Sequence, residues 1–226
     1  TDYQDRFGLL YNNNSYEAYL TSQGVKLIST DGTLGFDTER FIKAYENLLK
    51  IFDKTMVFNY NEDKYPGLTA RQAIVTLFDN RQALFFENGM SAAAQYMRTV
   101  TNVDFGFLPL PKLDEEQDKY YSYVSMSAPV LTIPKTNGDR LGDTGFILEA
   151  LCRESSRSVV PVYFDTCFSA KYTRDEESYE MILLATDSRM YDPGIIYNYG
   201  KIDTTILEAA KAGDEAIKSK LDAIKS

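Results

Sequence analysis

The sequence predicts an α/β fold, and three of its features support that prediction. Helical and strand-like patterns alternate along the 226 residues. Apolar residues recur at helical spacing from Asp37 onward, which predicts an amphipathic helix. Short apolar runs such as 83–86 lie between turn residues and have the length of strands. Alternation of this kind is typical of a sheet covered by helices and not of a helical bundle.

The first half of the chain contains these elements in turn. A strand at 6–11 leads to a polar loop at 12–15, and a second strand is expected at 25–29. The helix that Asp37 caps has an apolar stripe made of Phe41, Tyr45, Leu48, Leu49 and Phe52. The other elements are a loop at 59–70, a helix at 70–79, a buried strand at 83–86 and, after the Asn88–Gly89 turn, a helix at 91–94.

The second half is predicted to hold strands first and helices afterwards. We expect strands at 103–108, 120–124 and 128–134, then helices at 144–157 and 160–168. Thr173 and Glu176 form a capping box for a long helix, which the turn at 191–194 ends. The tail, 203–226, is predicted to be a helical pair broken at Gly213.

The charge balance argues against nucleic acid as a partner. Thirty-three acidic and 24 basic residues give a net charge of -9, which repels phosphate backbones. No apolar run approaches the roughly 20 residues that cross a bilayer. The first residues carry neither a start Met nor a signal peptide, so we expect a chain processed or excised from a longer protein.

The two cysteines, Cys152 and Cys167, lie in segments predicted to be helical and have apolar neighbours. We expect them to be small buried hydrophobic residues, and a disulfide between them is the alternative. Neither interpretation makes a metal site.

The absence of His restricts the possible chemistry. It excludes Ser-His-Asp and Cys-His nucleophile activation and removes the commonest ligand of catalytic zinc. A glycoside hydrolase with two carboxylates stays open, with Glu87, Asp104 and Asp192 as candidates. Seventeen Tyr residues offer stacking faces and hydroxyls, which suit a sugar or another polar ring.

Several segments of the chain contain recognisable sequence motifs, and these motifs follow one another in a fixed order. They are NRQALFFENG at 80–89, DFGFLPLPK at 104–112, YYS at 120–122, and the segments 128–135, 174–181 and 191–200. Read together, they resemble the family 1 extracellular solute-binding proteins of bacterial ABC importers, in a clostridial-type carbohydrate-binding branch. The resemblance runs from about Arg6 to Gly200.

The resemblance implies a type II periplasmic-binding-protein-like fold, of which the chain holds mainly the C-terminal lobe. It implies a C-terminal-lobe α/β core at 1–124, a hinge and N-terminal-lobe segment at 125–160, and a helical C-terminal region at 161–226. The chain departs from the family because the amino-terminal half that supplies most of one lobe has no counterpart here. Trp commonly stands where this chain has Tyr199.

The implied function is the capture of a sugar or oligosaccharide by hydrogen bonding and stacking, without catalytic residues, cofactor or metal. The implied partner is an ABC permease in the membrane. We expect a monomer that acts outside the cytoplasm, either anchored to the cell surface by a lipid or in the periplasm.

The Asn88–Gly89 turn follows a predicted strand and precedes a predicted helix, where α/β sheets bind ligands. The matching position in the family faces the cleft, so Glu87, Asn88, Gly89 and Ser91 are the first candidates. The alternative is a turn that needs Asn-Gly only for its backbone angles. The resemblance adds residues that would line the cleft floor near the hinge or lie further on: Tyr121, Tyr123, Ser125, Ser127, Tyr163 and Tyr197.

A third hypothesis is an interaction domain derived from the receptor fold. Such a domain would show an exposed apolar patch and no polar cleft.

Overall fold

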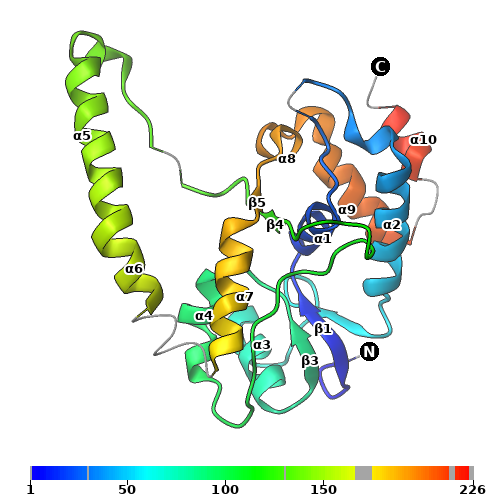
Figure 1. The fold of residues 1–226 in the computed structure, drawn as a ribbon. Helices are drawn as coiled ribbons and strands as arrows, with labels where there is room; N and C mark the ends of the chain where they lie inside the picture. The colour runs from blue at the N-terminus through cyan, green and yellow to red at the C-terminus, as the bar shows by residue number, and fades with distance from the viewer. Residues whose placement is uncertain (1, 30, 130, 166–174, 214–216, 224–226) are drawn as a thin grey trace.

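A computed structural model describes residues 2–29, 31–129, 131–165, 175–213 and 217–223 (Figure 1). Its centre is a parallel sheet of three strands in the order β2-β1-β3. The strands are β1 (Phe7–Tyr11), β2 (Val57–Asn59) and β3 (Ala83–Phe86). Leu9 of β1 lies opposite Val57 on one side and Phe85 on the other. The predicted α/β class is therefore confirmed.

Helices cover both faces of this sheet because side chains alternate along β1. Leu9 and Tyr11 pack against α1 (Ser15–Ser22), α2 (Glu39–Ile51) and α9 (Ile202–Ala212). Leu10 points to the other face and packs against α3 (Ala70–Asp79). The chain passes from β1 to β2, and α3 then returns it across the sheet to β3.

The helices predicted at 37–52 and 70–79 are confirmed as α2 and α3. Thr38, one residue later than expected, caps α2 by accepting a hydrogen bond from the Phe41 N–H at 3.1 Å. Thr69 and Gln72 form a reciprocal capping box at the start of α3. The side chains at 41, 45 and 48 are buried, as the apolar stripe predicts.

The prediction missed α1 and β2. Seven of the eight residues of α1 are buried, so the helix has no polar face and no amphipathic period to reveal it. The strand predicted at 25–29 is wrong, because that segment makes only one bridge, between Ile28 and Leu34. β2 has three residues, which is too short for a clear alternation.

β3 is a strand as predicted, but the expectation that it is buried is wrong. Leu84 is 72% exposed and Phe85 is 52% exposed. Both β2 and β3 are edge strands, but β2 is buried, so the difference lies in the cover over the two strands: the described residues leave the side chains of Leu84 and Phe85 largely uncovered. The strands predicted at 103–108 and 128–134 form no ladder in the part of the chain that the structure describes.

The strand predicted at 120–124 is reduced to β4 (Ser122–Tyr123), which pairs in parallel with β5 (Arg189–Met190). After β4 the chain leaves the body, and it returns through α7 (Glu176–Asp187), which leads into β5. We call residues 124–165 the projecting segment, because Figure 1 shows its helices standing away from the sheet. None of its described residues is buried.

The projecting segment contains η3 (Lys135–Arg140), α5 (Leu141–Glu154), a π-helical turn (Ser155–Val159) and α6 (Val160–Val162). The turn ends two residues before Pro161, which has no N–H to donate to the helix, so the regular bonding pattern is interrupted there. The helix predicted at 144–157 is confirmed. Cys152 is exposed, so its interpretation as a buried residue is wrong, whereas Cys167 lies outside the described residues.

Asp175 caps α7 by accepting a hydrogen bond from the Ser178 N–H, while the predicted cap Thr173 lies outside the described residues. The break in the tail at Gly213 is confirmed, with φ of 66°. The remaining elements are η1 (Gly35–Asp37), α4 (Ser91–Gln95), η2 (Met97–Thr99), α8 (Pro193–Tyr197), η6 (Tyr199–Lys201) and α10 (Ile217–Asp222).

Candidate functional site

Polar side chains gather where the three strands of the parallel sheet end. Asn12 follows β1, Tyr60 follows β2 and Glu87 follows β3. Because the strands are parallel, these residues meet at the carboxyl edge of the sheet. β1 and β3 flank the point where the connections diverge, which is where open α/β sheets bind ligands. We call Asn12, Ser15, Tyr60, Glu87 and Asn88 the polar corner.

The Asn88–Gly89 turn is built by hydrogen bonds at this edge. The Glu87 N–H donates to the Leu10 carbonyl at 2.9 Å, and the Gly89 N–H donates to Asn88 Oδ1 at 2.7 Å. Neither residue of the turn has a positive φ. The conformation of these two residues therefore does not require left-handed backbone angles.

Ser15 and Glu87 connect the start of α1 to the end of β3. The buried Ser15 hydroxyl accepts a hydrogen bond from the Asn12 N–H at 3.1 Å and donates one to Glu87 Oε2. Glu87 is half-buried, and the loss of solvent around its carboxyl group raises its pKa to about 7, against the lowering effect of Ser15. Glu87 therefore exchanges its proton near neutral pH.

Tyr60 lies between the two asparagines of the polar corner. Its hydroxyl oxygen accepts a hydrogen bond from Asn12 Nδ2 at 2.8 Å and another from Asn88 Nδ2 at 2.7 Å. Burial raises the pKa of Tyr60, so the phenol stays protonated at neutral pH. Its ring packs toward Phe86 at a centroid distance of 6.3 Å, which fixes the hydroxyl at the edge of the sheet.

The polar corner is therefore mostly neutral, made of amides and hydroxyls around one carboxyl group. In the described residues, no Lys or Arg bonds to any of its side chains. α7 approaches the chain just after the corner, where Thr186 Oγ1, which donates to the Ile182 carbonyl at 2.8 Å, lies 3.4 Å from the Met90 sulfur. Such a set of groups can exchange hydrogen bonds with a polar ligand, and its one hydroxyl bonded to a carboxylate, that of Ser15, belongs to a fully buried residue.

The structure brings some of the expected site residues together at this corner and places others elsewhere. Glu87 and Asn88 belong to it, Gly89 adjoins it through its N–H bond to Asn88 Oδ1, and Ser91 is exposed at the start of α4. The other candidates make their contacts away from the corner. The Tyr121 ring lies near the Lys119 ammonium group, the Tyr123 hydroxyl bonds to Glu17, and the N–H of the exposed Ser127 donates to the hydroxyl of the half-buried Ser125. The exposed rings of Tyr163 and Tyr197 contact Phe164 and Tyr199.

Tyr123 anchors the root of the projecting segment to α1. Its hydroxyl donates to Glu17 Oε2 at 2.6 Å. Burial raises the pKa of Glu17, and the Tyr123 bond opposes that rise. The bond therefore holds β4 on the body of the protein.

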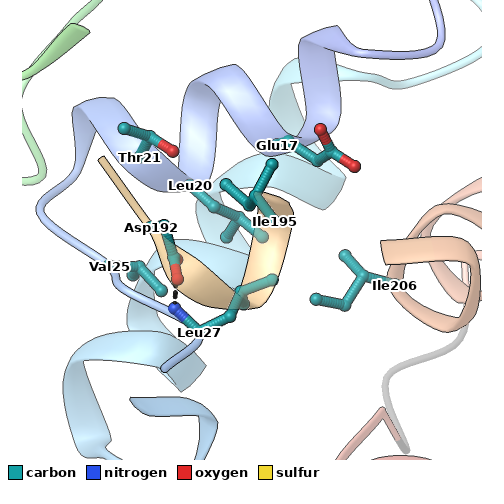
Figure 2. A pocket seen from close by; sticks show the side chains of 8 residues that line it. All are labelled: Glu17, Leu20, Thr21, Val25, Leu27, Asp192, Ile195 and Ile206. Atoms are coloured by element: carbon teal, nitrogen blue, oxygen red, sulfur yellow. Dashed lines mark hydrogen bonds between the residues drawn. The ribbon is translucent and has the colours of Figure 1, made fainter. Parts of the chain in front are cut away.

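A small cavity lies behind Glu17 and has a volume of about 10 Å³, close to the limit for one water molecule. Figure 2 shows Glu17 on one side of it and Asp192 on the other. Asp192 is buried and accepts hydrogen bonds from the N–H groups of Leu27, Ile28 and Gly194. These bonds give Asp192 a structural role, because they join the turn before α8 to the segment after α1.

Sequence reasoning missed Asn12, Ser15 and Tyr60 as site residues. The polar loop at 12–15 was visible after a predicted strand, so the position of Asn12 at a strand end was an available signal. Tyr60 could not be placed because β2 was not recognised. The bond from Asn12 to Tyr60 spans 48 positions and the bond from Ser15 to Glu87 spans 72.

The fold and the polar corner define an α/β protein with a candidate ligand site at the carboxyl edge of a parallel sheet. A scan against protein-family models found no match, and a search of curated proteins found no significant relative. Within the described ranges, no helix has the length and apolar character needed to span a bilayer. The same residues contain no cluster of three or more His, Cys, Asp or Glu positioned to hold a metal ion.

Proposed function

We propose that this protein is the substrate-binding component of a bacterial ABC importer and captures a neutral polar solute, a sugar or an oligosaccharide, without changing it. One observation carries the proposal: a half-buried network of amides and hydroxyls lies at the carboxyl edge of the sheet, across the ends of β2, β1 and β3. Neutral donors and acceptors of this kind match sugar hydroxyls, which both donate and accept hydrogen bonds.

The projecting segment supports a two-lobed arrangement of the periplasmic-binding-protein type. It leaves the body at β4 and returns through α7 to β5, so the exit and the return lie side by side in one small sheet. None of its described residues is buried, and Phe146 is 76% exposed and Leu131 is 70% exposed. A segment without a core cannot offset its loss of conformational entropy, so a second body is needed to cover it.

In the proposed arrangement, residues 1–124 and 161–226 form most of one lobe, and residues 125–160 belong to the hinge and the other lobe. Ligand binding would favour the closed form only through contacts with both lobes. Tyr121, Tyr123, Ser125 and Ser127 lie along the exit to the projecting segment, which is where a hinge would bring them toward a closing cleft. The proposed setting is outside the cytoplasm, next to a membrane permease.

The exposed apolar side chains of α5 favour a second candidate, an interaction domain that docks on another protein. Phe146, Ile147 and Leu151 of this helix are all more than half exposed. The polar corner favours the solute-binding function over the interaction domain, because docking through α5 does not require a network of polar groups at the sheet edge. The hypothesis of a two-carboxylate hydrolase gains no support from Asp192, one of its candidate residues. This carboxylate accepts hydrogen bonds from three backbone N–H groups, which gives it a structural role.

The test is an NMR titration of the ¹⁵N-labelled chain with maltotriose, cellotriose and xylotriose. We expect shifts of the Glu87 and Gly89 amides, with a Kd in the millimolar range, about -4 kcal/mol, because a cleft with one lobe makes half of its contacts. Asn88→Ala is expected to remove these shifts, whereas Asn14→Ala, at an exposed side chain in the β1–α1 loop, is expected to keep them. If no carbohydrate shifts these amides, the proposal is wrong.

A further inference from the structure

The two asparagine amides of the polar corner have fixed orientations. Asn12 Oδ1 accepts the Asn14 N–H at 2.8 Å, and Asn88 Oδ1 accepts the Gly89 N–H at 2.7 Å. An amide oxygen only accepts and an amide nitrogen only donates, so turning either group over would set N–H against N–H. Both Nδ2 groups must therefore face the Tyr60 hydroxyl.

These orientations determine where the Tyr60 hydrogen can go. A phenolic oxygen that accepts two N–H bonds uses its acceptor capacity on them and keeps one O–H to donate. Neither amide can accept that hydrogen, because each presents N–H to it. No other described residue forms a bond with this hydroxyl. Tyr60 therefore presents a free, oriented donor at the carboxyl edge of the sheet.

The same reasoning identifies a free acceptor on Glu87. Ser15 Oγ accepts the Asn12 N–H, so its own hydrogen is donated to Glu87 Oε2. The other carboxyl oxygen, Oε1, receives no hydrogen bond from a described residue. Asn12 joins the two free groups, since its backbone orients Ser15 and its side chain orients Tyr60. The polar corner thus offers one donor and one acceptor.

We propose that Tyr60 is the specificity-determining donor of the polar corner and that, together with Glu87 Oε1, it selects a ligand hydroxyl. A hydroxyl accepts from Tyr60 and donates to Glu87 at the same time. An ammonium group only donates, so it leaves the Tyr60 O–H unsatisfied. A carboxylate or phosphate only accepts, so it is disfavoured by the ionised form of the Glu87 carboxyl group, which predominates above about pH 7. This inference rests on the proposed function and names its ligand class as a neutral polyol.

The first test compares Tyr60→Phe with Tyr65→Phe in the NMR titration. Both side chains pack against the same core cluster, and no hydrogen bond of the Tyr65 hydroxyl is found in the described structure. We expect Tyr60→Phe to weaken the binding of the best neutral trisaccharide at least about tenfold and Tyr65→Phe to leave it unchanged, a difference of about 1.4 kcal/mol. D-glucosamine and D-gluconate are expected to bind the wild-type chain more weakly than the trisaccharide.

Monodeoxy analogues of the same trisaccharide separate a direct contact from a structural role. One analogue, which lacks the hydroxyl that Tyr60 bonds, should bind the wild-type chain more weakly than the parent trisaccharide does. The Tyr60→Phe variant should bind that analogue and the parent equally, because it has no donor for that hydroxyl. If Tyr60 only supported the fold, the variant would weaken all analogues equally. That result overturns the inference while leaving the proposed function in place.

A second variant, Asn12→Asp, reorients the Tyr60 hydroxyl without removing it. This variant tests the inference even if Tyr60→Phe does not fold. Asn12→Asp replaces the facing N–H by an oxygen at 2.8 Å, so the Tyr60 hydrogen would rotate inward to the carboxylate. We expect about tenfold weaker binding of the trisaccharide, whereas Asn14→Asp adds the same charge in the same loop and should have no effect. Unchanged binding in Asn12→Asp overturns the inference, and an absence of binding in the wild-type chain overturns it together with the proposed function.

Discussion

The body of the protein and the projecting segment contain helices of similar length that differ in how many of their side chains are buried. α2 has 13 residues and buries Phe41, Tyr45 and Leu48 against the sheet. α5 has 14 residues, and no residue of it is buried. Both contain enough apolar residues for a core. The comparison teaches that an amphipathic helix contributes to stability only where a second layer covers its apolar face.

The same comparison separates two ways of positioning polar groups. At the polar corner, three parallel strands place Asn12, Tyr60 and Glu87 together and hold each by hydrogen bonds. In the projecting segment, Ser125 and Tyr163 lie on a chain without buried neighbours. The corner therefore has a fixed geometry of its own, whereas the geometry of residues 124–165 depends on what covers them.

Hydrogen exchange should show the largest difference between the two regions. We expect the amides of Leu10 and Phe58, in the sheet, to exchange only on global unfolding, at a cost of about 5–15 kcal/mol. The amide of Leu151, in α5, should exchange with little protection, because an isolated helix of this length is marginal in water. Equal protection factors, measured by NMR on the same sample, would contradict the comparison.

Truncating a leucine in each region tests the same contrast by stability. Leu10 is fully buried, and Leu10→Ala should lower the free energy of unfolding by about 2–5 kcal/mol. Leu151 is 61% exposed, and Leu151→Ala should change it by less than about 0.5 kcal/mol. Urea unfolding followed by circular dichroism measures both values, and a large loss in Leu151→Ala would show that α5 is covered in solution.

The carboxyl group of Glu87 should make the stability of the body depend on pH. Its pKa is about 7 in the folded chain and about 4.3 in the unfolded chain, so the folded state binds more protons between these values. The stability is full below about pH 4.3 and falls as pH rises through about 7, by about 1–3 kcal/mol. Tyr19 and Tyr60, which interact with this carboxyl group, have raised pKa values and stay neutral in this window.

Glu87→Gln is expected to remove that loss, and urea unfolding at several pH values measures it. Glu115→Gln, at an exposed side chain, is the matched control and should keep the wild-type pH profile. A Glu87→Gln profile parallel to that of the wild type would show that Glu87 is as solvated in the folded chain as in the unfolded one.

The smallest of these effects is expected where the two regions join. Tyr123→Phe removes the bond to Glu17 and should lower the free energy of unfolding by about 1–2 kcal/mol, because a partly buried carboxylate loses its donor. Tyr191→Phe, at an exposed ring of the body, should have almost no effect. If the two variants behave alike in chemical denaturation, the bond does not anchor β4.

Local patterns predicted the elements that carry their own signals. The apolar period of α2 and the break at Gly213 each involve residues a few positions apart, so they could be recognised before the structure. The capping box of α3, Thr69 with Gln72, is an equally local signal, although the prediction of this helix did not use it. α1 could not, because it is buried on nearly all sides and shows no period. The extended run at 103–108 could not be distinguished from a strand, because pairing requires a neighbour that sequence does not show.

The sequence by itself determined that this is an α/β chain, that Asn88 and Gly89 lie between a strand and a helix, and that no His takes part in its chemistry. Only the tertiary structure decided that Asn12, Tyr60 and Glu87 share one corner and that α5 buries none of its residues. The reason is the sequence separation over which the two kinds of interaction act. Caps and periods act over three or four positions, whereas parallel strand pairing joins residues tens of positions apart and sets which faces are covered.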